Sequence, residues 1–237
     1  MTIKAILFDL DGTLLPMDQD KFIGSYAKAL AMRMMQKGYE PKKFIDSLWA
    51  GVGAMVKNDG SCMNHDAFWK AFCAIHGEKV MEDKPFVDEF YRIEFNQIQA
   101  SCGYTQKSKE LIDELKGTGV KIVLATNPLF PEMATAHRIR WAGLAPEDFE
   151  LFTTYDNSRF CKPNLKYYLE ILEKIGCKPE ECIMVGNDVS EDMIAEQLGM
   201  KVFLLTDCII NKEEKDINLY SHGSFEELRE FLLTCIS

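Results

Sequence analysis

Through residues 17 to about 100, apolar side chains recur every three or four positions, and glycines stand where the repeats stop. This spacing is typical of amphipathic helices. The repeats are Phe22, Tyr26, Leu30 and Met34 before Gly38; Phe44, Leu48, Val52 and Met55 after Pro41; Phe68, Phe72 and Ile75 before Gly77; and Phe86, Phe90 and Ile93 in a helix that reaches about residue 100. No strand pattern interrupts them. The stretch is therefore predicted to be entirely helical.

The rest of the chain alternates between short apolar runs and helical repeats. The predicted strands are residues 5–8, 120–125, 151–154, 182–185 and 201–205, and the predicted helices are residues 106–116, 131–143, 164–175, 190–199 and 224–233. One strand, a helical insertion and then repeated strand–helix units indicate an α/β fold. We predict a doubly wound, Rossmann-like parallel sheet with an inserted all-helical domain. The expected boundaries are residues 1–16 and 101–237 for the α/β domain and 17–100 for the helical one.

Charge and composition restrict the classes of function. The net charge of -10 and the pI near 5.0 argue against a general affinity for nucleic acid or for anionic membranes. No apolar run approaches the roughly 18 residues of a membrane span, and no signal-peptide core precedes the first acidic residues. Eight cysteines form no CxxC pair, which favours free thiols in a reducing cytosol over disulfides or zinc ligands. We expect a cytoplasmic protein.

Two carboxylates follow the first strand directly. Asp9 and Asp11 are two residues apart, so in an extended segment they point to the same side and repel each other unless a cation or a shared proton lies between them. Mg²⁺ prefers oxygen ligands, and Gly12 allows the backbone to bend so that a carbonyl also faces the ion. The alternative is an ordinary Asp-Gly turn with solvated carboxylates.

The ends of the other strands select further residues. In open α/β sheets, ligands bind beyond the carboxyl ends of the strands. The polar residues in these positions are Thr126 and Asn127 after the second strand, Lys162 in the loop after the third, and Asp188 with Asp192 after the fourth. We expect them to lie with Asp9 and Asp11 in one site.

Four short segments then give a resemblance. DLDGT at residues 9–13, ATN at 125–127, CKP at 161–163 and VGNDVSED at 185–192 resemble the four ordered motifs of the haloacid dehalogenase (HAD) superfamily of phosphohydrolases. The helical insertion resembles the cap of the phosphoglycolate phosphatase and β-phosphoglucomutase branch. Asn187 stands where many relatives have Asp, and the segment after Pro163 lacks a second proline found in several relatives.

The resemblance implies roles for these residues. Asp9 would be the nucleophile that forms an aspartyl-phosphate, and Asp11 would be the general acid and then the base. Thr126, Asn127 and Lys162 would bind the phosphoryl group, with Lys162 neutralising its charge. The implied cofactor is Mg²⁺, held by metal ligands at Asp9, Asp11, Asp188 and Asp192, of which Asp192 would complete or buttress the site.

Each of the less certain residues has a plainer interpretation. Thr126 could cap a loop, Lys162 could be a surface lysine before a helix, and Asp192 could be a favourable acid in the first turn of a helix that Ser190 caps. In the cap, Met32, Met34, Met35, Trp49 and Met55 are interpreted as core.

An aromatic residue and two arginines follow the segment 125–127. Phe130 would lie beside the phosphate and face the leaving group. Arg138 and Arg140 could help to bind an anionic substrate, but they are interpreted as solvated helix arginines.

The leading hypothesis is a Mg²⁺-dependent phosphatase that acts on a small phosphorylated metabolite, as a monomer or homodimer with no nucleic-acid or membrane partner. A phosphoryl-transfer mutase of the same family and a non-catalytic sensor of phosphorylated ligands remain alternatives. A dehalogenase is disfavoured, because displacement of a halide has no use for Asp11 as an acid or Asp188 as a ligand.

Overall fold

The computed structural model describes residues 2–236, and their centre is a six-stranded sheet in which every neighbouring pair is parallel. The strands are β1 (Ala5–Phe8), β2 (Lys121–Leu124), β3 (Leu151–Phe152), β4 (Cys182–Gly186), β5 (Lys201–Leu205) and β6 (Ser221–Gly223). Their order across the sheet is β3-β2-β1-β4-β5-β6. The chain thus reverses its direction of winding at β1, and this confirms the predicted α/β doubly wound sheet.

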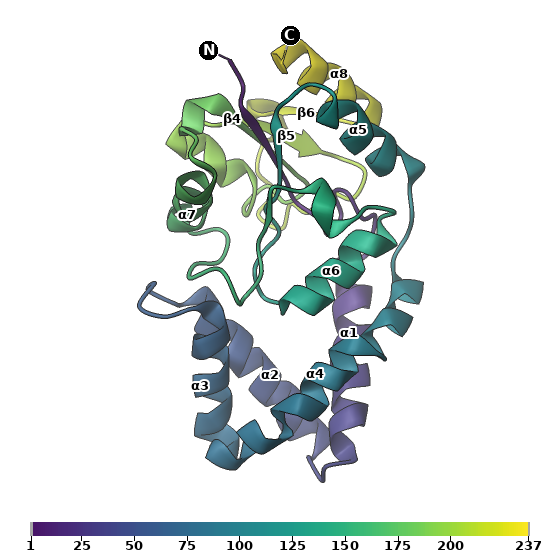
Figure 1. Ribbon diagram of the computed structural model, residues 1–237, viewed down its shortest axis with the longest axis vertical. Coiled ribbons are helices and arrows are strands. Elements are labelled where there is room, and N and C mark those ends of the chain that lie inside the picture. The colour runs from purple at the N-terminus through teal and green to yellow at the C-terminus, as the bar shows by residue number, and fades with distance from the viewer. Residues whose placement is uncertain (1, 237) are drawn as a thin grey trace.

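Helices cover both faces of the sheet (Figure 1). The helices are α1 (Gln19–Met35), α2 (Pro41–Val56), α3 (Asn64–His76), α4 (Lys84–Arg92), α5 (Gln106–Lys116), α6 (Glu132–Trp141), α7 (Leu165–Ile175) and α8 (Phe225–Ile236), with short 3₁₀ helices η1 (Glu78–Asp83), η2 (Phe95–Ser101), η3 (Pro146–Asp148), η4 (Pro179–Glu181), η5 (Met193–Leu198) and η6 (Ile217–Leu219). Alternate residues of the strands pack on opposite faces. Leu7 contributes to a core beneath α7 and η5, whereas Phe8 contributes to the core shared by α5, α6 and α8.

The chain leaves and re-enters the α/β part at one place. Met17 and Cys102 form an antiparallel bridge, and the Gly103 N–H donates to the Pro16 carbonyl at 2.7 Å. Between these points, α1–α4 form the lower body of Figure 1, at the end opposite the two termini. The division into residues 1–16 with 101–237 and a cap at 17–100 remains a prediction, to which these crossing points correspond.

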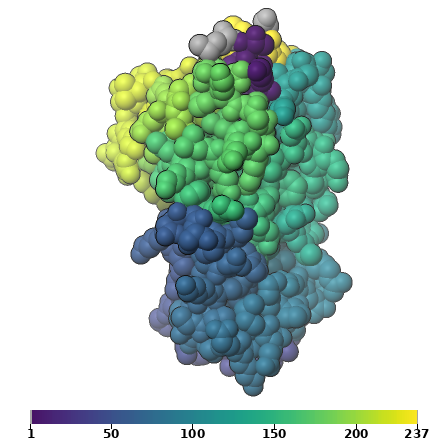
Figure 2. All heavy atoms as spheres, turned by 60° about the vertical axis from the view of Figure 1, so that its left-hand side comes forward, coloured from purple at the N-terminus to yellow at the C-terminus, as the bar shows by residue number. Residues whose placement is uncertain are grey.

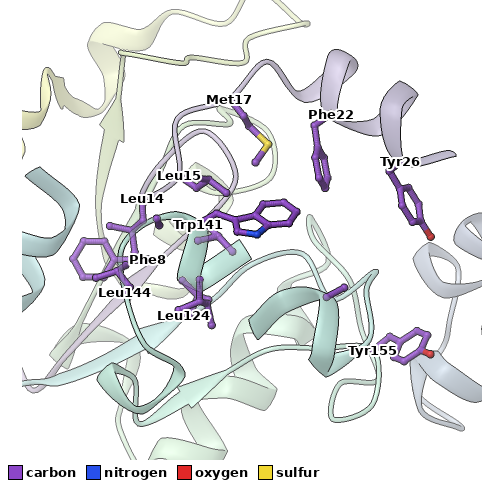
Figure 3. Packing of buried hydrophobic residues seen from close by; sticks show 14 of the residues in the cluster. Phe8, Leu14, Leu15, Met17, Phe22, Tyr26, Leu124, Trp141, Leu144 and Tyr155 are labelled. Atoms are coloured by element: carbon purple, nitrogen blue, oxygen red, sulfur yellow. The ribbon is translucent and has the colours of Figure 1, made fainter. Parts of the chain in front are cut away.

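A continuous apolar cluster joins the helical part to the sheet. Phe22 of α1 lies 6.4 Å from Trp141 of α6 and 6.0 Å from Phe130, measured between ring centroids. Figure 3 shows Phe22 and Trp141 beside Leu15 and Met17, and Figure 2 shows the two parts in contact on the outer surface. The helical part is therefore seated on the carboxyl edge of the sheet, over the strand ends that carry the predicted site.

Three local predictions need correction. The helix expected to continue to about residue 100 ends at Arg92, and η2 follows because Phe95 stacks on Trp141 at 5.2 Å, so tertiary packing sets the break. The helix expected from residue 190 is the 3₁₀ helix η5, which begins after Asp192, and Ser190 does not cap it. A sixth strand, β6, was not predicted because its sequence, Ser-His-Gly, contains no apolar run.

The methionine stripe of the cap is also only partly core. Met34 and Met55 are buried, but Met32, Met35 and Trp49 are exposed. Helix geometry explains the difference in α1, because the buried stripe runs through Leu30 and Met34, and positions two before and one after Met34 fall on other faces.

In the described residues, no helix is long and apolar enough to span a membrane. All eight cysteines are free thiols; Cys161 and Cys182 are buried and the others are half-buried.

Candidate active site

Asp9 stands at the centre of the carboxyl edge. Its N–H donates to the Val185 carbonyl of β4 at 2.8 Å, and the Phe8 carbonyl accepts from the N–H of Ala125, which follows β2, at 2.7 Å. The backbone of Asp9 is thus held between both neighbouring strands. The residue is only 7% exposed, so its carboxylate faces an interior site with fixed geometry.

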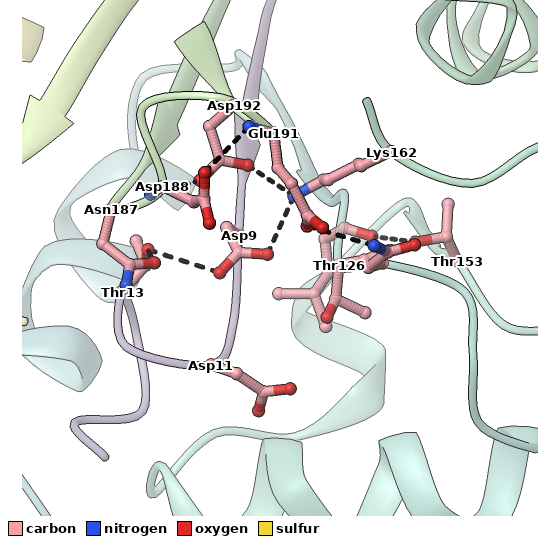
Figure 4. A network of polar contacts seen from close by, with 12 residues as sticks. Asp9, Asp11, Thr13, Thr126, Thr153, Lys162, Asn187, Asp188, Glu191 and Asp192 are labelled. Atoms are coloured by element: carbon pink, nitrogen blue, oxygen red, sulfur yellow. Dashed lines mark hydrogen bonds and ion pairs between the residues drawn. The ribbon is translucent and has the colours of Figure 1, made fainter. Parts of the chain in front are cut away.

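Lys162 is buried and contacts two carboxylates. Its Nζ donates to Asp9 Oδ1 at 2.8 Å and to Asp192 Oδ1 at 2.6 Å (Figure 4). Burial acts to lower the pKa of Lys162, but the charges of Asp192 and Asp9 outweigh it and hold the pKa well above its usual range. The surface-lysine interpretation is therefore excluded, since Lys162 is 1% exposed.

The carboxylate of Asp192 is held by Lys162 and by a backbone N–H group. Its Oδ2 accepts the Asp188 N–H at 3.0 Å while its Oδ1 binds Lys162, so both carboxylate oxygens are engaged. The close approach of this carboxylate requires glycine at 186, because a Cβ there would lie 2.0 Å from Asp192 Oδ2. Burial raises the pKa of Asp192, and Lys162 opposes that rise.

A second group of contacts fixes the loop after β1. The Thr13 hydroxyl donates to Asn187 Oδ1 at 3.0 Å, and Asn187 Nδ2 donates to the Cys208 carbonyl at 2.7 Å. Gly12 has a φ of 91°, and a Cβ at this position would lie 2.3 Å from Asn187 Nδ2. Asn187, which departs from the usual motif, is thus a buried brace between the loops after β1 and β5.

Asp11 lies apart from the network around Asp9 (Figure 4). Its Oδ2 accepts a hydrogen bond from Nη1 of Arg138 on α6. Burial raises the pKa of Asp11 to about 6, against the lowering effect of Arg138. The carboxyl group can therefore exchange a proton near neutral pH.

Arg138 corrects a prediction. It was expected to be solvated, but it is 1% exposed, whereas Arg140 is indeed exposed. The sequence did contain a signal, because Ala134, Arg138 and Trp141 follow the spacing of a buried helix face. An arginine on such a face needs an anion, and Asp11 provides it.

Thr126 and Asn127 follow β2 at the same edge. The Thr126 carbonyl accepts hydrogen bonds from the hydroxyls of Thr153 and Tyr167 at 2.6 and 2.8 Å, which fixes its backbone. Asn127 Nδ2 donates to Glu191 Oε2 at 3.0 Å. Sequence reasoning did not single out Glu191, although it lies within the last motif; burial raises the pKa of its carboxyl to about 7.

Only some of the predicted carboxylate ligands are placed to bind Mg²⁺. Within residues 2–236, no three His, Cys, Asp or Glu side chains gather closely enough to hold an ion by themselves. Mg²⁺ is commonly held by one or two carboxylates, with water and substrate oxygens completing its shell. Asp188 Oδ1 accepts the N–H groups of Ser190 and Glu191, while its Oδ2 makes no hydrogen bond to the described residues. Asp9 and Asp188 therefore fit the ion, and the side chains of Asp11 and Asp192 are committed elsewhere.

A family model described as haloacid dehalogenase-like hydrolase matches residues 3–199. The chain belongs to this family. The match spans all four HAD motifs, and it confirms the resemblance that the sequence suggested.

Several proteins similar to this HAD-family chain are named as phosphatases. A glyceraldehyde 3-phosphate phosphatase of Methanothermobacter thermautotrophicus is 25% identical over 218 residues, which cover 91% of this chain and 91% of the relative. A phosphoglycolate phosphatase of Aquifex aeolicus is 25% identical over 209 residues, covering 85% and 84%. The crystal structure of a 2-haloacid dehalogenase from Pseudomonas syringae pv. Tomato DC3000 has a TM-score of 0.65 at 18% identity, covering 98% of this chain and 99% of that one, and supports the fold. The chain is a hydrolase, and the names of its relatives support phosphate esters as the bonds it cleaves.

Proposed function

We propose that the protein is a Mg²⁺-dependent phosphatase that hydrolyses a small phosphorylated metabolite through an aspartyl-phosphate on Asp9. The observation that carries this proposal is the buried Lys162, whose ammonium group binds Asp9 Oδ1 directly. A carboxylate that is ion-paired with a buried cation, at the carboxyl end of the central strand, is suited to attack phosphorus. The phosphatase names of the two relatives support the same reaction class.

The proposed hydrolysis has two steps, formation of the aspartyl-phosphate and its hydrolysis. In the first, a carboxylate oxygen of Asp9 bonds to phosphorus, the bond from phosphorus to the ester oxygen breaks, and Asp11 gives its proton to the leaving alcohol. In the second, Asp11 takes a proton from water, the water oxygen bonds to phosphorus, and the bond from phosphorus to the Asp9 oxygen breaks, which restores the Asp9 carboxylate and releases inorganic phosphate. The pKa of Asp11 near 6 suits a group that must both give and accept a proton.

Lys162 and the loop after β2 would bind the phosphoryl group. Lys162 reduces the repulsion between Asp9 and the incoming phosphoryl oxygens, and Asp192 holds its ammonium in place. Hydrogen bonds to its carbonyl hold Thr126 in place, so its hydroxyl and the backbone N–H of Asn127 would bind phosphoryl oxygens.

Asp9, Asp188 and the backbone carbonyl of Asp11 would hold Mg²⁺. When bound, the ion would neutralise phosphoryl oxygens and offset the charges of the acidic residues. Asp192 would buttress this site through the Asp188 N–H rather than touch the ion.

The protein is proposed to work in the cytoplasm, as a monomer or homodimer. Its eight free thiols suit a reducing compartment. The two relatives share the same 25% identity with this chain but are named for different substrates, so neither name decides what this protein hydrolyses.

Phosphate release from a panel of phosphorylated metabolites tests the proposal, with wild type and Asp9→Asn compared in Mg²⁺ and in a chelator. We expect metal-dependent release by wild type and a loss of about 1,000-fold or more in the variant, because the nucleophile is absent. Release of phosphate by Asp9→Asn at the wild-type rate would show that Asp9 is not the nucleophile. Release that persists in the chelator would refute the requirement for Mg²⁺, and no release from any compound would refute the phosphatase activity.

A further inference from the structure

An apolar cavity lies where the cap meets the α/β part. Its volume is about 70 Å³, and its walls come from α1, α2, α3, η1 and α4 of the cap and from the loops after β2 and β3. Figure 3 shows two of the lining residues, Tyr26 of α1 and Tyr155 of the loop after β3. Every lining side chain is apolar or aromatic, and among residues 2–236 no charged side chain lines the cavity. The space therefore suits a neutral hydrocarbon group better than water or an ion.

One wall of the cavity belongs to the loop that carries the proposed phosphoryl-binding residues. Leu129 and Phe130 line the cavity, and they follow Asn127 by two and three positions. The Leu129 N–H donates to the Asn127 carbonyl at 2.8 Å, so this turn is shorter than the roughly 10 Å that three extended residues span. The Phe130 ring also contacts Arg138, whose central carbon lies 4.4 Å from the ring centroid and whose guanidinium group binds Asp11. The cavity thus begins beside the proposed donor of a proton to the leaving group.

The cavity is not sealed on the side of this wall. Ile23 of α1, Leu129 and Phe130 are all half-buried, so space remains between the cap and the loop after β2. On the walls, the hydroxyls of Tyr26 and Tyr91 lie 2.5 Å apart and bond to each other, which leaves them less able to bind water. A hydrocarbon group attached to an ester oxygen at Asp11 can therefore enter without competing with bound water.

The volume of the cavity limits the size of the group that can enter. An apolar protein cavity of about 150 Å³ holds one benzene molecule, which has six carbon atoms. In proportion, about 70 Å³ corresponds to three or four carbon atoms. A branched group such as isopropyl has this size and fills a compact space better than a straight chain does. A second phosphate or a carboxylate would lose its hydration in the cavity without gaining a partner.

We propose that this cavity binds the leaving group, and that the substrate is a phosphate monoester of a short, branched aliphatic alcohol with no second charge. The phosphoryl group would lie at Asp9 and Lys162, the ester oxygen at Asp11, and the hydrocarbon part in the cavity past Phe130. Removal of the hydrocarbon from water would then favour this ester over smaller ones. This inference rests on the proposed phosphatase activity, in which the leaving group meets Asp11.

The test compares 2-methylpropyl phosphate with ethyl phosphate. The two leaving alcohols have similar acidity, so the chemical step is alike, and they differ by two carbon atoms that the cavity would bury. Each buried CH₂ group contributes about fourfold in affinity, so wild type should favour 2-methylpropyl phosphate by about 15-fold in kcat/KM. The ratio is the readout because it cancels a general loss of activity.

Two substitutions in α2 separate the cavity from the rest of the cap. Val52→Phe adds four carbon atoms to a side chain that lines the cavity, and it should bring the ratio close to one. Val56→Phe is the matched control, because position 56 lies one helical turn further along α2 and is 44% exposed. Val56 does not line the cavity, so this variant should keep the wild-type ratio.

Two further measurements keep the test decisive. Val52→Ala enlarges the cavity and should shift the preference toward 3-methylbutyl phosphate, which has one more carbon atom, so it replaces Val52→Phe if that variant does not fold. Calorimetric binding of 2-methylpropyl and ethyl phosphate to Asp9→Asn gives the first comparison without turnover. The larger ester should bind more tightly and with the more negative heat-capacity change, because it buries more apolar surface.

The outcomes separate the two proposals. An active wild type with a ratio near one, or an unchanged ratio in a folded Val52→Phe, would overturn the role of the cavity and leave the phosphatase standing. Tighter binding of 2-methylpropyl phosphate to Asp9→Asn, with no hydrolysis of any phosphate ester by wild type, would instead overturn the proposed function and support the cavity. Neither hydrolysis nor a preference in binding would overturn both.

Discussion

Removal of the charge on Asp192 should destabilise the protein, and Asp192→Asn is the cleanest change. Lys162 and Asp192 are each 1% exposed, and their atoms Nζ and Oδ1 lie 2.6 Å apart. The new amide oxygen can still accept the Asp188 N–H, so the change removes charge more than shape. Lys162 would then be a buried cation with one carboxylate partner in place of two.

The expected size follows from that remaining partner. Loss of one member of a buried ion pair costs about 3–5 kcal/mol when the other charge is left uncompensated. Asp9 still binds Lys162 at 2.8 Å and compensates part of its charge, so we expect a loss below this range, about 2–3 kcal/mol. For a chain of this length, each 1 kcal/mol shifts Tm by about 2–4 °C, so Tm should fall by about 4–12 °C.

Thermal unfolding followed by circular dichroism, in a chelator at pH 7, measures this shift without metal binding. Asp113→Asn is the matched control, because its ion pair with Lys109 is exposed on α5, and Tm should not change. Lys162→Met/Asp192→Asn should recover part of the loss, since it removes the buried cation as well. A Tm for Asp192→Asn equal to that of the Asp113 control, or a double variant that simply adds the two single losses, would refute the reasoning.

Three further changes test other parts of the site. Gly186→Ala should displace the Asp192 carboxylate and lower stability by about 1–3 kcal/mol, measured by urea unfolding; an unchanged midpoint would contradict the required close approach. Because the pKa of Glu191 is raised, the folded protein holds a proton on this carboxyl between pH 4.5 and about 7, whereas the unfolded chain does not. The contribution of Glu191 to stability is therefore greatest below pH 4.5 and is lost as the pH rises to 7. The stability of Glu191→Gln relative to wild type should therefore increase from pH 5 to pH 8, by at most about 3 kcal/mol, and a pH-independent difference would reject the shift. Burial raises the pKa of the Cys161 thiol to about 12, so iodoacetamide should not label it in the native protein at pH 8; peptide mass spectrometry would reveal early labelling, which would contradict this burial.

The sequence predicted those parts of the structure that a local pattern determines. The run Ala5–Phe8 could be assigned to a buried strand because it is short, apolar and ended by Asp9, and the rule about strand ends then selected Thr126, Lys162 and Asp188 without a structure. Parallel strands bring their carboxyl ends to one edge whatever lies between them. The contact of Lys162 with Asp9 follows from this topology.

The parts that were missed depend on contacts between distant segments. Arg138 was interpreted as solvated because charge alone suggests exposure, whereas its burial depends on Asp11, 127 positions away in the chain. β6 has no apolar run of its own and exists by pairing with β5. No spacing in the sequence reveals that Asp192 binds Lys162, and for this reason our proposal gives Asp192 a supporting role beside the metal site.

Chemical trapping of the phosphorylated enzyme tests most directly whether Asp9 is the nucleophile. During turnover, borohydride reduces an aspartyl-phosphate to homoserine, which peptide mass spectrometry can locate. We predict homoserine at residue 9 only when Mg²⁺ and a hydrolysed substrate are both present, and none in Asp9→Asn. Turnover without any modification at residue 9, or modification at another carboxylate, would contradict the mechanism.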